Sequence, residues 1–120
     1  MLTRLPDTTR GDACVAGCTG VHSYTHDGAR WCWPGAEPGR EAMDAEITTV
    51  EPPEHLSRRL HRGDDFWVVW TGLEVVAKLT DTPALSLLAR HGLPTVVPTG
   101  ISLDHVQVGD TLICQGRWAA

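Results

Sequence analysis

The segment FWVVWTGLEVVAKL, residues 66–79, contains the longest apolar run of the chain and decides which fold the sequence predicts. Residues 66–70 are a β-branched and aromatic run, and apolar residues alternate through residues 73–79 as in a half-buried strand. Thr71 and Gly72 separate the two runs by the length of a two-residue hairpin loop. The sequence therefore predicts a central β-hairpin over residues 66–79.

Two short helices and several strands are predicted around this hairpin. Residues 45–50 resemble a strand, and residues 53–62 resemble a helix with a proline in its first turn and leucines four positions apart. Residues 84–91 form a second helical pattern after a Thr-Pro start. Residues 95–118 predict two or three short strands, the last at 111–115. We expect an α+β fold with a mixed sheet.

Length and composition indicate one small domain. The chain has 120 residues, 42% of them hydrophobic and 21% charged, which is too apolar for a disordered segment. Its longest apolar run is far shorter than the roughly 20 residues that cross a bilayer, and its first residues do not begin a secretory signal. Nine of the ten basic residues are Arg and Asn is absent, which indicates a bacterial-like, GC-rich coding sequence. We expect a soluble cytoplasmic protein with no membrane partner.

The sequence divides into two parts. Residues 1–40 are rich in Gly, Pro, Asp and Thr, lack helical or strand periodicity, and end in the breaker run at 34–39. This part is predicted to be an irregular, Cys- and His-rich arm with a linker, and Trp31 and Trp33 are predicted to anchor it by packing. Residues 41–120 are predicted to form the compact α+β domain.

Five side chains of the arm have the chemistry of zinc ligands: Cys14, Cys18, His22, His26 and Cys32. In a reducing cytoplasm, cysteines are expected as thiols or metal ligands rather than disulfides. Three thiolates with His22 or His26 would complete a tetrahedral Zn²⁺ site. The pair at 14 and 18 is separated by three residues, whereas structural zinc sites usually use two. Buried thiols with polar loop histidines remain the alternative, and a redox pair is disfavoured because the Cys-x-x-Cys spacing is absent.

The most basic stretch ends the helix predicted at 53–62. It carries Arg58, Arg59 and Arg62, which are the candidate contacts for a protein partner or for DNA. Alternatively, these arginines stay solvated and complement the helix dipole. The formal net charge of −5 argues against a broad basic surface. The sequence thus favours a small non-enzymatic binding or regulatory module, acting on a protein, on a second copy of itself or on DNA.

An enzyme is the second hypothesis. The chain has no phosphate-binding glycine loop, no Gly-x-Ser-x-Gly elbow and no His-Glu-x-x-His helix. Its reactive side chains are scattered, so the enzymatic hypothesis combines a Cys or His of the arm with an acid such as Asp65 or Asp104. No cofactor other than zinc is expected.

The middle of the chain resembles one known family. Residues 47–60, then Gly63, then the hairpin expected at 67–79 and the helix after it are similar to the strand–helix–hairpin–helix order of the prevent-host-death antitoxins. In that family an N-terminal dimer binds operator DNA and a C-terminal tail wraps a toxin. The resemblance therefore implies a regulatory, DNA-binding role. Forty residues precede the first strand here, whereas the family normally starts at that strand.

Overall fold

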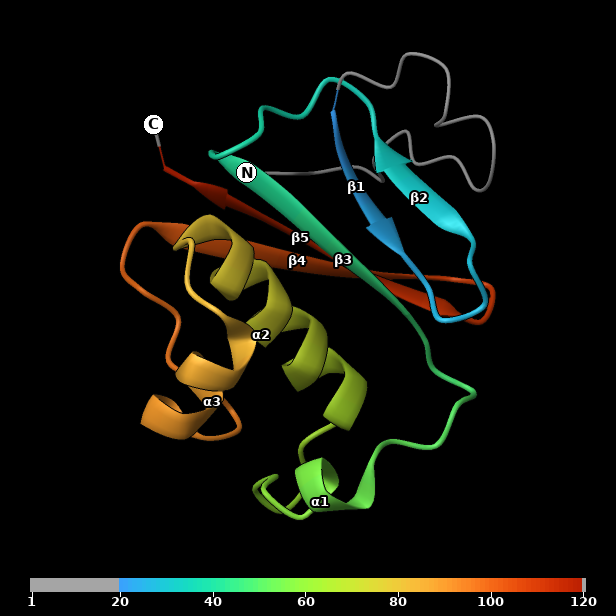
Figure 1. The fold of residues 1–120 in the computed structure, drawn as a ribbon, viewed down its shortest axis with the longest axis vertical. Coiled ribbons are helices and arrows are strands. Elements are labelled where there is room, and N and C mark those ends of the chain that lie inside the picture. The colour runs from blue at the N-terminus through green and yellow to red at the C-terminus, as the bar shows by residue number, and fades with distance from the viewer. Residues whose placement is uncertain (1–19, 120) are drawn as a thin grey trace.

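The fold is α+β, as the sequence predicts, and a computed structural model describes it over residues 20–119. Five strands and three helices belong to this part of the chain (Figure 1). In chain order they are β1 (Val21–Tyr24), β2 (Arg30–Trp33), β3 (Glu41–Ile47), α1 (Glu54–Ser57), α2 (Phe66–Leu79), α3 (Ala84–His91), β4 (Ile101–Val108) and β5 (Thr111–Trp118).

The central layer is a three-stranded antiparallel sheet with the order β3-β5-β4. The β1–β2 hairpin covers one of its faces, and α2 crosses the other (Figure 1). Neighbouring residues of β3 mark the two faces, because successive strand residues point to opposite sides. Ala42 packs with Val75 and Leu79 of α2, whereas Met43 packs with Trp31 and Trp33 of β2.

The predicted hairpin over residues 66–79 is wrong, because this segment is the helix α2. The Asp65 carboxylate accepts hydrogen bonds from the backbone N–H groups of Trp67 and Val68 and so caps the first turn. The helix is buried against the sheet on one side and against α3 on another, so it is apolar over most of its circumference. A helix that is buried on two sides also has apolar residues at every second position, which is the spacing of a half-buried strand. For this reason the sequence pattern predicted a hairpin instead of a helix.

Other predicted elements need smaller corrections. The sheet is antiparallel rather than mixed, and there are three helices rather than two. The helix expected at 53–62 is the four-residue α1, followed by turns through residue 63. The strand expected at 45–50 is β3, which begins and ends earlier. Because 66–79 is helical, the strand–helix–hairpin–helix order that resembled the prevent-host-death antitoxins is not present.

The last helix and the last strands were predicted more closely. The helix at 84–91 is α3, and β4 with β5 forms a hairpin that turns at Gly109 and Asp110. Cys114 lies in β5, within the sheet as expected. No helix of the described chain is long and apolar enough to span a bilayer.

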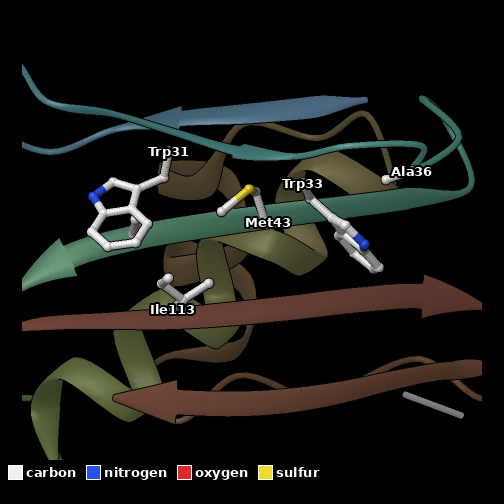
Figure 2. Packing of buried hydrophobic residues seen from close by; sticks show 6 residues of the cluster. Trp31, Trp33, Ala36, Met43 and Ile113 are labelled. Atoms are coloured by element: carbon white, nitrogen blue, oxygen red, sulfur yellow. The ribbon is translucent and has the colours of Figure 1, made fainter. Parts of the chain in front are cut away.

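The described part of the arm is ordered by two tryptophans. Trp31 and Trp33 are each 6% exposed and lie over Met43 and Ile113 of the sheet, as Figure 2 shows. Their packing role is therefore confirmed. The irregular structure expected for the arm is wrong over β1 and β2, which pair in antiparallel register.

Candidate functional site

A hollow of about 550 Å³ separates α1 from α3, and we call it the α1–α3 groove. Its walls combine cationic and apolar side chains. They are His55, Leu56, Arg58, Arg59, Leu85 and Leu88. The sequence-predicted contact residues Arg58 and Arg59 are thus brought together with leucines of a helix about thirty residues further along the chain.

A second hollow of about 400 Å³ adjoins the groove and shares Arg59 and Leu88 with it. It adds the imidazoles of His61 and His91 to the side chains that line this region. Arg62, the third predicted contact, is exposed but lines neither hollow. The groove therefore includes two of the three predicted arginines.

The arginines of the groove are available to a partner. Arg58 and Arg59 are exposed and form no ion pair within residues 20–119. Because α1 has only four residues, its dipole is small, and the favourable interaction of the two arginines with its C-terminal end is weak. Leu85 is 70% exposed beside them, so an apolar side chain is also presented to solvent here.

A separate cluster of carboxyl groups lies where β3 meets α2, and the sequence reasoning missed it. Asp44 of β3 is 6% exposed. Its Oδ1 accepts a hydrogen bond of 3.3 Å from the Ser23 hydroxyl of β1 and lies 4.0 Å from the Lys78 Nζ of α2. Its Oδ2 meets no donor among the described residues, and the Glu46 carboxylate is close enough to repel its charge.

Burial and neighbouring carboxylates explain the ionisation of this cluster. Burial, followed by repulsion from Glu46, raises the pKa of Asp44 to about 7, although the Lys78 ammonium opposes the shift. Burial also raises the pKa of Glu46 and of Glu74. Repulsion between two neighbouring carboxylates disfavours the charged form of Asp44, in the same direction as its burial.

Cys114 of β5 lies between its two register partners, Asp44 of β3 and His105 of β4. The three residue types are those of a Cys-His-Asp triad. These three residues cannot act as a nucleophilic triad in this arrangement. Cys114 is fully buried, and burial raises the pKa of its thiol far above neutral. His105 instead directs its Nε2 toward the carbonyl oxygen of Val68, 3.1 Å away.

The predicted zinc ligands fall partly outside the described residues, where Cys14 and Cys18 lie. His22 and Cys32 are register partners in the β1–β2 hairpin, and His26 is exposed in its turn. Cys32 is disulfide-bonded, so the expectation of a free thiol is wrong for it, whereas Cys114 is a free thiol. Within residues 20–119, no three His, Cys, Asp or Glu side chains are placed to hold a metal ion.

The acids named in the enzymatic hypothesis have other positions. Asp65 is the N-cap of α2, so its carboxylate is committed to backbone N–H groups. Asp104 lies on β4 opposite Gln115, on the sheet face that the β1–β2 hairpin covers. The helix that Asp65 caps covers the opposite face of the sheet from the β1–β2 hairpin (Figure 1).

The missed carboxyl pair had a signal in the sequence. Asp44 and Glu46 are two positions apart in a strand and therefore share a face. Ala42, two positions earlier on the same face, packs against apolar side chains of α2. Only the position of α2 reveals that the face is buried. No protein-family model, curated protein or solved structure matches this chain.

Proposed function

We propose that this protein is a small binding module whose α1–α3 groove takes an acidic, partly apolar segment of a protein partner. The observation that carries the proposal is that two exposed arginines, which form no ion pair among the described residues, line one hollow together with an exposed leucine. Arg58 and Arg59 would bind carboxylates, and Leu85 with Leu88 would bury an apolar side chain of the same segment.

The distribution of charge supports a protein partner rather than DNA. The chain as a whole carries a formal charge of −5, yet four of the eight basic residues in 20–119 are Arg58, Arg59, Arg62 and Arg90, on or near α1 and α3. DNA binding depends on many phosphate contacts along a duplex. A local patch that includes leucines fits a short acidic segment better.

The test uses defined peptides, since the natural partner is not identified. One fluorescein-labelled helical peptide carries Glu and Leu at i,i+4 spacing, and a matched peptide has Lys in place of Glu. We expect anisotropy to report saturable binding of the acidic peptide only. The double variant Arg58→Glu, Arg59→Glu should abolish it, because the charge of the groove is reversed.

The control variant is Arg40→Glu, which changes an arginine just before β3, at the opposite end of the molecule from α1 (Figure 1). It should leave peptide binding unchanged. Equal binding of both peptides would contradict the proposal. Binding of a labelled DNA duplex that falls steeply with salt and is lost in the double variant would replace it with the DNA alternative.

A further inference from the structure

A second cavity, independent of the groove, lies between α2, β4 and residues 94–97. Its volume is about 120 Å³. Its walls are mostly aliphatic and carry one imidazole. They include Val69, Gly72, Leu73, Val97, Leu103 and His105. Val97 is 42% exposed, so this wall of the cavity borders solvent and gives a ligand a way in.

The size and lining of the cavity favour a small ring. Apolar cavities of about 150 Å³ in proteins stay dry and bind benzene, because a water molecule inside them lacks hydrogen-bond partners. The present cavity is slightly smaller and mostly aliphatic, and its polar lining consists of His105 and of Thr95, whose buried Oγ1 has no hydrogen-bond partner among the described residues. A single six-membered ring is therefore the largest group that it would take without rearrangement of its walls.

Nδ1 of His105 has no hydrogen-bond partner among residues 20–119, on a side chain that is itself exposed to solvent. Its Nε2 lies 3.1 Å from the Val68 carbonyl oxygen and 3.2 Å from Thr71 Oγ1. A carbonyl only accepts, so Nε2 carries the proton and Nδ1 of the neutral ring is an acceptor. Burial lowers the pKa of His105, which favours the neutral ring. A ligand that donates a hydrogen bond would satisfy Nδ1.

Gly72 is the second observation that points to a ligand. Glycine inside a helix costs about 1 kcal/mol relative to alanine. An alanine Cβ at this position would lie 3.4 Å from Leu103 Cδ1, which is ordinary contact. Packing therefore does not require glycine here, whereas an added methyl group would enter the cavity. The glycine keeps the cavity open at the expense of helix stability.

We propose that this cavity binds a small monocyclic aromatic molecule with one hydroxyl group, its ring against Gly72, Leu73 and Leu103 and its hydroxyl donating to His105. Phenol is the simplest member of this class and is the probe. Toluene has the same size without the hydroxyl. A ligand of seven heavy atoms is expected to bind with a Kd of roughly a millimolar.

The experiment is a titration of ¹⁵N-labelled protein with phenol and with toluene, followed by amide chemical shifts. Saturable shifts should be confined to α2, β4 and residues 94–97. Gly72→Ala and Val97→Phe should each abolish them, because both fill the cavity from different walls. Ser86→Ala, on the exposed side of α3, should change nothing.

The hydroxyl contact is tested by His105→Phe. This variant should weaken phenol by about fivefold, the loss of one hydrogen bond, and leave toluene unchanged. An equal effect on both ligands would overturn the assignment of His105. The whole proposal fails if phenol gives no saturable shifts up to about 20 mM, well above the expected Kd. Shifts centred on the α1–α3 groove, or binding that survives in both filled variants, would also overturn it.

Discussion

Gly116 of β5 lies directly under Val75 of α2, so close that a Cβ on the glycine would be 2.4 Å from Val75 Cγ1. The same Cβ would lie 2.8 Å from Leu103 Cδ2 and 3.2 Å from Leu79 Cδ1. Helix α2 can approach the sheet at this point only because β5 has no side chain there. The absence of a side chain at Gly116 thus sets the spacing of these two layers.

Gly116→Ala is therefore expected to destabilise the protein by about 1–3 kcal/mol, the range for overpacked cores. Urea unfolding followed by circular dichroism measures the change. Gly72→Ala is the matched control, since both variants remove a glycine from the unfolded chain. It should stabilise the protein, by up to about 1 kcal/mol. If both variants had the same sign, the close contact at Gly116 would not control stability.

Asp44→Asn should remove part of the pH dependence of stability. The folded pKa of Asp44, about 7, lies above its ordinary value of 3.8, so the folded protein holds a proton that the unfolded chain releases between these values. The contribution of Asp44 to stability is therefore highest below about pH 4, falls as the pH rises towards 7, and is level above it. Asparagine carries no charge and still accepts the Ser23 hydrogen bond.

We expect Asp44→Asn to be more stable than wild type at pH 8 by at least about 1 kcal/mol, and to match it more closely near pH 4. Some dependence of the same sign should persist, because burial also raises the pKa of Glu46 and Glu74. Urea midpoints between pH 4 and 8.5 provide the profile. Glu51→Gln, at an exposed position, should keep the wild-type profile. A parallel profile in Asp44→Asn would show that Asp44 ionises normally.

Asp65→Ala tests the start of α2. Asp65 Oδ1 accepts from the Trp67 N–H at 3.0 Å and from the Val68 N–H at 3.4 Å. Loss of such an N-cap costs about 1 kcal/mol, and Asp65→Asn should restore most of it. Asp64→Ala, one residue earlier and also exposed, is the control. Thermal unfolding that is the same in Asp65→Ala and Asp64→Ala would contradict the stabilising role of the cap.

Zinc remains a prediction for the reduced protein. A sulfur in a disulfide is not a thiolate, so Cys32 cannot be a zinc ligand while it is disulfide-bonded. We expect protein purified without reductant or chelator to contain less than about a tenth of an equivalent of zinc. Elemental analysis before and after reduction decides the point. One equivalent in the reduced protein, lost in Cys32→Ser, would support the ligand set of Cys14, Cys18 and Cys32 with His22 or His26.

The sequence by itself determined the features that depend on local chemistry. The helix at 84–91 follows from a Thr-Pro start and a glycine stop, and the β4–β5 turn follows from Gly109 and Asp110. The packing of Trp31 and Trp33 follows from the size of their side chains in a segment with little else to bury. Each of these rests on residues that are close together in the sequence.

Only the tertiary structure decided between helix and hairpin for residues 66–79. The β-branched and aromatic side chains favour a strand locally, but burial against the sheet and α3 together stabilises the helix. The same is true of the two candidate sites. Leu85 lines one hollow with Arg58 and Arg59, and His105 lines the other with Gly72, because elements that are far apart in the chain pack together. Burial and distance, the quantities that decide the pKa of Asp44 and the shape of each hollow, exist only once those elements have packed.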